Sequence, residues 1–322
     1  MNLLVTGGAG FVGSSFIKNF LGGAYEFIEK ITVIDKLTYA GSLSNLPKFP
    51  QERFDFHQGD IGDEKLVRNL LFGIDAVVNF AAESHVDRSI LNSNDFIQTN
   101  IVGVQVILDA INSTGRDIRY LQVSTDEVYG SIDVGSWTEE MPLQPNSPYS
   151  ASKACAELLS RVANKTHALD VVITRSSNNY GPYQFPEKLI PKFITNLLEG
   201  RKIPVYGSGT NVRDWLHVDD HCRGVYNALV NGKSGSIYNI GGGMELTNLE
   251  LTRLLLDILG ADESEIEYIT DRKGHDFRYS VDWKKIQYEL GYQPQIEFKE
   301  GLKSTVQWYR ENQAWWKPRM SH

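Results

Sequence analysis

The feature that constrains the fold most is a glycine-rich segment near the amino terminus, Thr6-Gly7-Gly8-Ala9-Gly10-Phe11-Val12-Gly13. It follows a short apolar run and precedes a helical pattern, so it joins a strand to a helix through a tight turn. Glycines in such a turn let the backbone approach a pyrophosphate group, which the amino terminus of the helix then stabilises. The alternative is a glycine turn that serves packing alone, and the surrounding sequence has to decide between the two.

The segments around this turn predict the fold class. Up to about residue 177, β-branched runs alternate with helical patterns, which is typical of a parallel, doubly wound sheet. Beyond it, prolines and glycines divide the chain into loops and shorter helices. We predict an α/β protein with a Rossmann-type doubly wound parallel sheet and a smaller mixed α/β substrate-binding lobe. The expected strands are residues 3–6, 31–34, 54–58, 76–80, 119–124 and 171–174, and the expected helices are 95–112, 149–167, 188–199, 219–230 and 247–259.

Charge and composition exclude several classes of function. The 322 residues carry a formal net charge of −8, which argues against nonspecific binding to nucleic acid or to a membrane surface. An anionic substrate therefore needs locally placed cations. The first residues lead into a strand without a cationic leader or a long apolar run, so we expect a cytoplasmic protein. The two cysteines, Cys155 and Cys222, lack metal-ligand spacing, so we expect no metal site.

Asp35 gives the glycine turn a functional meaning. It ends the second expected strand about 20 residues after the turn, where a carboxylate accepts hydrogen bonds from the adenosine ribose and repels a 2′-phosphate. This favours NAD over NADP as the cofactor, although the neighbouring Lys36 weakens the preference. The alternative for Asp35 is a residue that only forms a turn at the end of the strand.

Tyr149 and Lys153 are four residues apart on an expected helix and therefore share a face. The lysine ammonium would lower the phenol pKa from about 10, so that the phenolate acts as a base. The same lysine could hold the nicotinamide ribose. The alternative for an isolated Tyr-x-x-x-Lys pattern is ordinary surface amphipathicity. Together with the glycine turn and Asp35, the pair resembles the extended short-chain dehydrogenase/reductase family, whose members oxidise and modify nucleotide-activated sugars.

Asp126 and Glu127 indicate which reaction follows oxidation. They come directly after an expected strand, where open α/β sheets bind ligands. Two adjacent carboxyl groups in a partly buried site do not ionise together easily, so one stays protonated as an acid while the other acts as a base. Elimination of water needs this division. The alternative is a solvated acidic turn.

Longer motifs resemble the dTDP-glucose 4,6-dehydratase family, a group of NAD-dependent hydro-lyases, over nearly the whole chain. They are residues 37–41, 81–88, 124–130, 178–191, 213–217 and 271–275, with Tyr279. The resemblance implies that Tyr149 removes the proton of the C4 hydroxyl while hydride passes to NAD, and that Thr125 hydrogen-bonds the developing ketone. It also implies that Glu127 removes the C5 proton, that Asp126 protonates the departing C6 hydroxyl, and that hydride returns to C6.

The expected site has three parts, of which the catalytic one is Thr125, Asp126, Glu127, Tyr149 and Lys153. The expected NAD-binding residues are Gly7, Gly10, Phe11, Val12, Gly13, Asp35, Lys36, Thr38, Asp60, Ile61, Phe80, Ala81, Ala82, Thr99, Ser124, Tyr149, Lys153 and Asn179. The expected substrate-binding residues are Ser84, His85, Arg88, Thr125, Asn178, Glu187, Lys188, Leu189, Pro204, Tyr206, Arg213, Asn248, Arg272, His275 and Tyr279. Resemblance points to Arg213, Arg272 and His275 for the diphosphate, whereas His85 could equally be a structural histidine.

The pattern of segments sets the expected domains, and the resemblance sets the expected partners. Residues 1–177 form the NAD-binding Rossmann domain, to which 214–235 return, and residues 178–213 and 236–322 form the sugar-nucleotide-binding domain. The expected substrate is dTDP-glucose, although thymidine rests on resemblance alone and UDP- or GDP-sugars stay open. A homodimer through the helices at 95–112 and 149–167 is a family expectation, and their apolar stripes could instead be core.

Two other functions are compatible with parts of this sequence. A nucleotide-sugar 4-epimerase or decarboxylase of the same superfamily would share the glycine turn, Tyr149 and Lys153 but would not need the pair Asp126 and Glu127. A non-catalytic NAD-sensing protein or scaffold could keep the fold alone. The complete set of catalytic residue types argues against the second alternative.

Overall fold

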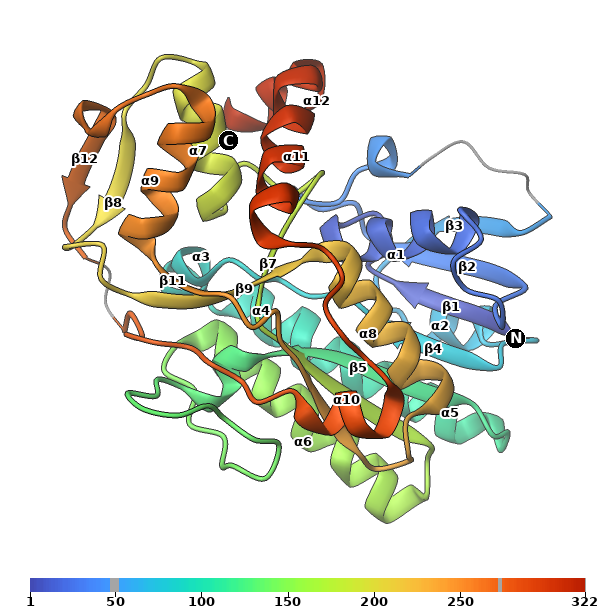
Figure 1. The fold of residues 1–322 in the computed structure, drawn as a ribbon. Helices are drawn as coiled ribbons and strands as arrows, with labels where there is room; N and C mark the ends of the chain where they lie inside the picture. Colours follow the sequence, from blue (N-terminus) through green and yellow to red (C-terminus); the bar gives the residue numbers. More distant parts are fainter. Residues whose placement is uncertain (47–51, 272–273, 322) are drawn as a thin grey trace.

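The computed structural model describes residues 1–46, 52–271 and 274–321, and its centre is a seven-stranded parallel sheet (Figure 1). The strand order is β10-β6-β5-β4-β1-β2-β3. The predicted Rossmann-type α/β fold is therefore confirmed. The strands are β1 (Asn2–Thr6), β2 (Lys30–Asp35), β3 (Phe54–Gln58), β4 (Ala76–Asn79), β5 (Arg119–Thr125), β6 (Val171–Ser176) and β10 (Ile237–Ile240).

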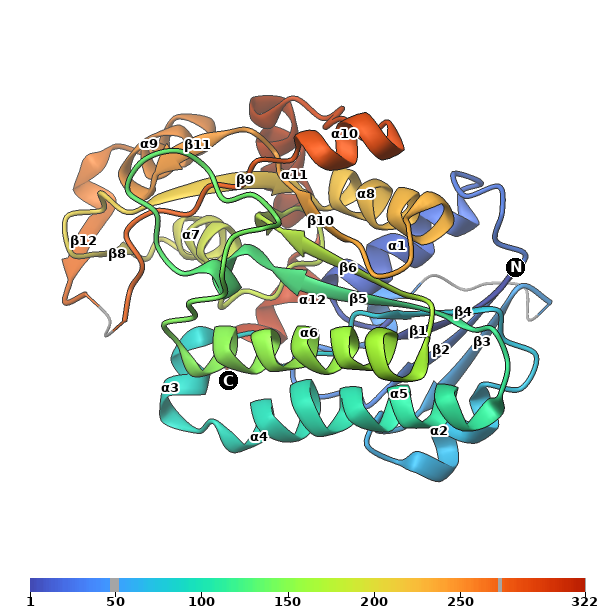
Figure 2. The ribbon, with the colours of Figure 1, turned by 90° about the horizontal axis from the view of Figure 1, so that it is seen from below.

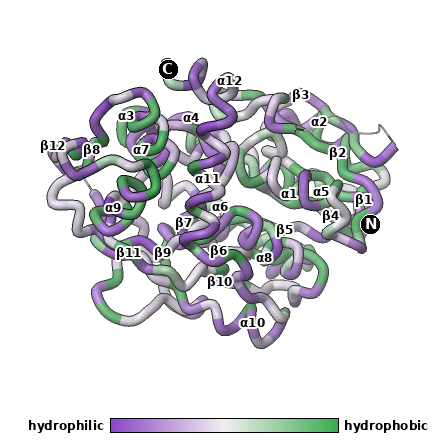
Figure 3. The backbone as a smooth tube through the Cα atoms, turned by 45° about the horizontal axis from the view of Figure 1, so that its top comes forward, coloured by the Kyte–Doolittle hydropathy of each residue, from purple (hydrophilic) through white to green (hydrophobic). Residues whose placement is uncertain are grey.

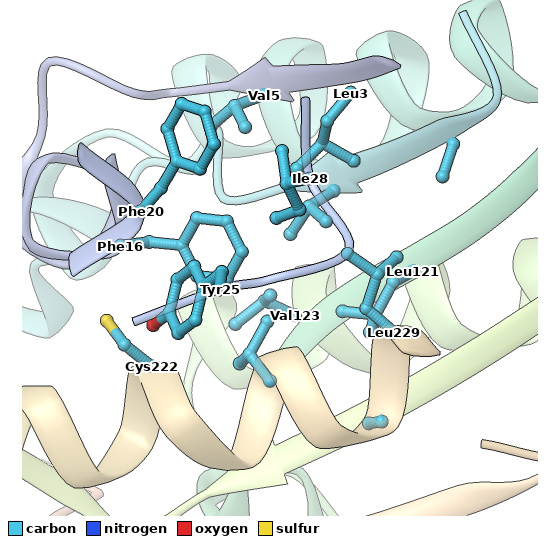
Figure 4. Packing of buried hydrophobic residues seen from close by; sticks show 14 of the residues in the cluster. Leu3, Val5, Phe16, Phe20, Tyr25, Ile28, Leu121, Val123, Cys222 and Leu229 are labelled. Carbon is cyan, nitrogen blue, oxygen red and sulfur yellow. The ribbon is translucent and has the colours of Figure 1, made fainter. Parts of the chain in front are cut away.

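Helices cover both faces of this sheet because successive side chains of a strand point to opposite sides (Figure 2). Leu3 packs with Phe16 of one helix layer, whereas Leu4 packs with Ile107 of the other. Figure 4 shows the first of these cores, with Phe20 near Val5 and Ile28 near Leu3. One layer contains α1 (Phe11–Leu21), α8 (Val218–Asn231) and α10 (Lys284–Leu290), and the other contains α2 (Glu64–Leu70), α5 (Gly103–Thr114) and α6 (Pro148–His167).

The smaller lobe is built from two short sheets and three main helices. The sheet β11-β9-β7 is mixed, and β8 and β12 form a parallel pair. Phe193, Leu255 and Trp316 lie in its own hydrophobic core. Its elements are β7 (Asn178–Tyr180), β8 (Ile203–Tyr206), β9 (Val212–His217), β11 (Glu245–Thr247), β12 (Ile266–Ile269), α7 (Leu189–Leu198), α9 (Asn248–Leu259) and α11 (Phe298–Glu311).

Short elements complete the described chain and connect the lobes. Figure 3 shows hydrophobic segments in the region of β1, β2 and β4, in agreement with their burial. None of the helices within residues 1–46, 52–271 and 274–321 combines the length and apolarity needed to cross a membrane. The short elements are η1 (Leu43–Asn45), α3 (Val86–Leu91), α4 (Asn94–Ile97), η2 (Gln98–Val102), η3 (Asp126–Tyr129), η4 (Glu263–Glu265), α12 (Gln313–Trp316) and η5 (Lys317–Ser321).

Two details of the fold differ from the sequence pattern. The single helix expected at residues 95–112 is divided into α4, the π-helical segment η2 and α5. Strand β10 pairs with β6, although its residues follow position 236, where the smaller domain was expected to resume. We therefore propose that residues 1–177 and 218–241, together with α10, form the larger domain and that the other described residues form the smaller one.

Candidate active site

A cavity of about 310 Å³ lies where the strands of the main sheet end. Every residue expected at the NAD site and every expected catalytic residue lies on its wall. Of the residues expected only at the substrate, Ser84, Asn178, Glu187 and Lys188 also lie there. The structure thus brings the local sequence motifs together at one site.

The glycine turn forms the floor of the cavity beside the end of β4. Gly7 has φ +67°, and a Cβ at this position would lie 2.5 Å from the backbone nitrogen of Ala81. Only glycine therefore fits there without displacing the backbone. Asp35 fixes the turn, because its carboxylate accepts hydrogen bonds from the backbone N–H of Ala9 and of Leu37, both at 2.8 Å.

Asp35 has the turn-forming role considered for it and also lies on the cavity wall. Two backbone N–H groups donate to its carboxylate. A carboxylate has about four acceptor sites, so two remain for a ribose. Lys36 instead forms an ion pair with Asp60 at 2.6 Å, and this pair lowers the pKa of Asp60 despite its partial burial. The lysine charge is therefore already compensated by a carboxylate.

The acidic pair begins the turn η3 because β5 ends at Thr125. The Thr125 hydroxyl accepts a hydrogen bond from the backbone N–H of Glu127 at 3.2 Å and donates to Oδ1 of Asp126 at 3.2 Å. Asp126 is 2% exposed, and its Oδ2 has no hydrogen-bond partner among the described residues. Burial, and then the charges of Glu127 and Asp214, raise the pKa of Asp126 well above its usual range. Asp126 therefore keeps its proton to a higher pH than an ordinary aspartate does.

Tyr149 and Lys153 lie on the first turns of α6, which face the acidic pair. Burial and the Glu127 charge raise the pKa of Tyr149, whereas a hydrogen bond with Thr125 lowers it. Lys153 donates its Nζ hydrogen bond to the carbonyl of Val123 at 2.7 Å, and burial lowers its pKa to about 8. The expectation that Lys153 lowers the phenol pKa is wrong for this structure, because burial and a nearby carboxylate dominate.

His85 and Arg88 lie behind the cavity wall. The Arg88 guanidinium bonds Glu187 at 2.9 Å and covers the Tyr39 ring at 4.0 Å. His85 begins α3 and accepts the backbone N–H of Arg88 at 3.4 Å, so it has the structural role considered for it. Burial lowers the pKa of His85 to about 4, and the imidazole is neutral at pH 7. Lys188 donates to the carbonyl of Ser84 at 2.6 Å.

The remaining expected substrate residues lie in the smaller lobe and outside the cavity wall. Arg213 is 5% exposed, stacks over the Tyr279 ring at 4.3 Å and donates to the carbonyl of Asp276 at 2.9 Å. His275 bonds Asp271 at 2.6 Å. Arg272 lies outside the described residues. The others in this group are Leu189, Pro204, Tyr206 and Asn248.

Several residues of the cavity wall were not predicted. His221 of α8 bonds Asn179 through Nδ1 at 2.9 Å, and burial lowers its pKa to about 3. No local pattern distinguishes it from other polar residues of that helix. Residues 39–41 follow Thr38, which is the residue of the 37–41 motif that is expected at the NAD site. The unpredicted wall residues include Tyr39, Ala40, Gly41, Glu83, Val123, Ser176, Ser177, Gln184, Phe185 and His221.

The donors and acceptors of this cavity fit a dinucleotide. Ser124 Oγ and His221 Nε2 are buried, line the cavity and have no hydrogen-bond partner among the described residues. Buried polar atoms without partners are rare unless a ligand or water meets them. The described residues contain no cluster of three or more histidine, cysteine or acidic side chains arranged for a metal ion.

The sheet, the glycine turn and the Tyr/Lys pair define an NAD-dependent enzyme of the extended short-chain dehydrogenase/reductase class. The family model described as GDP-mannose 4,6 dehydratase matches residues 4–305. A dTDP-glucose 4,6-dehydratase of Actinoplanes sp. is 55% identical over 322 residues, which cover 98% of this chain and 100% of that protein. The chain belongs to the family of nucleotide-sugar 4,6-dehydratases, and within it to the dTDP-glucose 4,6-dehydratases.

Solved structures agree with this placement. A dTDP-glucose 4,6-dehydratase from Streptomyces venezuelae, solved with NAD and TYD bound, has a TM-score of 0.97 and 57% identity, covering 99% of this chain and 100% of that one. A UDP-glucose 4-epimerase from Thermotoga maritima, solved with UDP-glucose, has a TM-score of 0.89 and 30% identity, covering 97% and 100%. The fold is therefore shared with epimerases. The fold alone does not distinguish a dehydratase from an epimerase, so the distinction depends on the residues of the site.

Proposed function

We propose that the protein is an NAD-dependent dTDP-glucose 4,6-dehydratase, which converts dTDP-glucose to dTDP-4-keto-6-deoxyglucose and water. The observation that carries this proposal is the buried Asp126, whose pKa is raised, beside Glu127 on the wall of the same cavity as Tyr149. A 4-epimerase needs the tyrosine but has no step that uses an acid and a base together. The high similarity to dehydratases supports the same choice.

The first proposed step is oxidation at C4. NAD, when bound, supplies a hydride acceptor, a positive ring charge that favours the phenolate, and later a hydride donor. Tyr149 removes the proton of the C4 hydroxyl, and the hydroxyl of Thr125 hydrogen-bonds the forming carbonyl oxygen. Lys153, whose pKa burial lowers to about 8, holds the nicotinamide ribose. Positioned proton transfer of this kind contributes about 10²–10⁴-fold to the rate.

The second proposed step is the loss of water. The C4 ketone acidifies the C5 hydrogen, which Glu127 removes as a proton. Asp126 gives its proton to the C6 hydroxyl, which leaves as water, and a C5–C6 double bond forms. Hydride then returns to C6, and the Glu127 carboxyl, after exchanging its proton with solvent, protonates C5. Net redox is zero.

Thr125 contacts both residues whose protonation state the reaction changes. Tyr149 has gained one proton in this sequence and Asp126 has lost one. The Thr125 hydroxyl is hydrogen-bonded to Asp126 Oδ1 at 3.2 Å and also to Tyr149. We propose that it passes the proton from the phenol to the carboxylate.

We also propose where the substrate anion binds and how the protein assembles. Arg213, Arg272 and His275 of the smaller lobe supply the cations for the diphosphate, since arginine suits phosphate geometry. A homodimer through α4, η2 and α6 is supported by exposed apolar side chains along these elements. They are Ile97, Val102, Leu158 and Val162. The two unpaired cysteines suit a reducing, cytoplasmic location.

The test is incubation of the purified protein with dTDP-glucose in deuterated water without added reductant. We expect mass spectrometry and NMR to show the loss of one water, a new methyl group and deuterium at C5. A C4 epimer with unchanged mass would favour the epimerase, and an unchanged sugar would contradict the proposed substrate.

A further inference from the structure

The carboxyl-terminal residues reach back to the glycine turn. Trp315 of α12 donates its indole N–H to Oδ1 of Asn45 at 2.7 Å. Asn45 is 1% exposed and donates from Nδ2 to the carbonyl of Ala9 in the turn at 2.8 Å. Two consecutive hydrogen bonds therefore connect the carboxyl-terminal segment to the turn that follows β1.

Arg319 reinforces this connection. Its guanidinium stacks over the Trp315 ring at 4.3 Å and donates to the hydroxyls of Ser42 and Ser44, both at 2.9 Å. The backbone N–H of Ser42 also donates to the carbonyl of Ala9, at 3.0 Å. Residues 42–45 directly follow the part of the cavity wall formed by residues 38–41. The carboxyl terminus thus fixes one wall of the cavity.

Trp315 also contacts Tyr183, which directly precedes a second part of the cavity wall. Its ring meets that of Tyr183 edge-on, with centroids 5.6 Å apart and an angle of 82°. Tyr183 has φ +67°, a conformation that a non-glycine residue keeps only where its surroundings hold it. The next residues, Gln184 and Phe185, line the cavity, and Tyr309 of α11 donates a hydrogen bond to the carbonyl of Gln184. A single indole ring therefore contacts the two segments that adjoin residues 38–41 and residues 184–185 of the cavity wall.

We propose that Trp315 and Arg319 are positioning residues that hold these two parts of the cavity wall together and slow the release of NAD. This inference rests on the proposed placement of NAD at the glycine turn. A wall that is already ordered loses less conformational freedom when the cofactor binds. Differences in affinity among variants of one site are expressed mainly in the dissociation rate. An enzyme that returns hydride to the same substrate molecule gains from a retained cofactor.

The test compares two tryptophan variants of the full-length protein. Trp315→Phe keeps an aromatic ring but removes the bond to Asn45. Trp316→Phe removes an equally short indole bond, to the carbonyl of Tyr309 at 2.7 Å, within the smaller lobe, and is the matched control. We expect Trp315→Phe to release NAD about fivefold faster, which corresponds to one hydrogen bond, with kcat at saturating NAD unchanged. We expect Trp316→Phe to release it at the wild-type rate.

A third variant separates this inference from the placement of NAD. Asp35→Ala should weaken NAD binding if NAD occupies the cavity. If Asp35→Ala weakens binding while Trp315→Phe releases NAD at the wild-type rate, the inference is overturned and the placement stands. If Asp35→Ala leaves binding unchanged, the placement is wrong and the inference falls with it. Asn45→Ala and Trp315→Phe should combine non-additively, and additive effects on the dissociation rate would contradict a shared contact.

Discussion

Asp126 is the single residue on which the proposed elimination depends most, because it must hold a proton at neutral pH. We expect Asp126→Asn and Glu127→Gln each to lower the rate of dehydration about 10²–10⁴-fold while NAD reduction persists. Tyr149→Phe should abolish both dehydration and NAD reduction. The measurements are the absorbance of reduced nicotinamide and the methyl signal of the product. Glu140→Gln, an exposed acidic position nearby in sequence, is the control, and wild-type dehydration in either amide variant would refute the assigned roles.

The same carboxyl group should destabilise the folded protein as the pH rises. Burial and neighbouring charges raise the folded pKa of Asp126 above its unfolded value of about 3.9. Its contribution to stability is therefore complete below that value and is lost as the pH rises through the folded pKa. Asparagine does not titrate, so Asp126→Asn should unfold at a higher temperature than wild type at pH 7–8. Thermal unfolding of both proteins from pH 5 to 8 should show a difference in Tm that grows with pH. A difference in Tm that does not depend on pH would contradict a raised pKa for Asp126.

The sequence predicts residues of the site well where one motif contains them. The glycine turn, Asp35 and the pair Asp126 and Glu127 lie next to strand ends, so the topology of the sheet alone brings them together. Arg213 could be assigned to the site only by resemblance, because its position depends on how the smaller lobe packs. The pKa of Tyr149 was mispredicted for a related reason, since burial depends on the complete fold.

Among the elements, the interrupted helix α4-η2-α5 shows how local geometry serves the site. The π-helical turn contains Asn100, whose side chain accepts from the backbone N–H of Glu83 at 2.9 Å and donates to its carbonyl at 3.0 Å and to Ser152 at 2.8 Å. Glu83 lies on the cavity wall and Ser152 lies on the helix of Tyr149. The π-turn therefore ties two parts of the site together, as such turns often do.

We expect Asn100→Ala to lower the free energy of unfolding by about 1–3 kcal/mol, because it leaves buried polar groups without partners. NAD affinity should fall as well, because Glu83 on the cavity wall loses its hydrogen bonds with the Asn100 side chain. Denaturant unfolding and NAD titration measure the two effects. Asn112→Ala, on an exposed face of α5, is the control and should change neither. An unchanged free energy of unfolding in Asn100→Ala would show that these contacts do not stabilise the fold.

Elements with strong periodicity were predicted closely, and others were not. The helix α6 and the strand β3 match their expected ranges because apolar spacing and caps are local signals. The interruption at η2 leaves no signature in the spacing of apolar residues. Strand β10 has only four residues and joins the sheet beside a strand far away in sequence, so its place follows from tertiary pairing alone.

At the scale of the whole molecule, the chain crosses between its lobes several times. The larger domain supplies the glycine turn and the catalytic residues, and the smaller one supplies Asn178, Glu187 and Lys188 to the same cavity. The carboxyl terminus then returns to the first βα turn through Trp315. The site is therefore complete only when both lobes have folded together, which explains why residue ranges alone describe the domains poorly.

The outer face formed by α4, η2 and α6 should bury its apolar residues in a homodimer. Leu158 and Val162 of α6 are 50% and 54% exposed, and they lie one helical turn apart on one face. We expect wild-type protein to sediment as a dimer and Leu158→Glu combined with Val162→Glu to sediment as a monomer, because two facing charged patches cannot be buried together. Tyr288→Glu, an equally large change at an 82% exposed position of α10, should leave the dimer intact. A monomeric wild type, or a dimeric double variant, would contradict this interface.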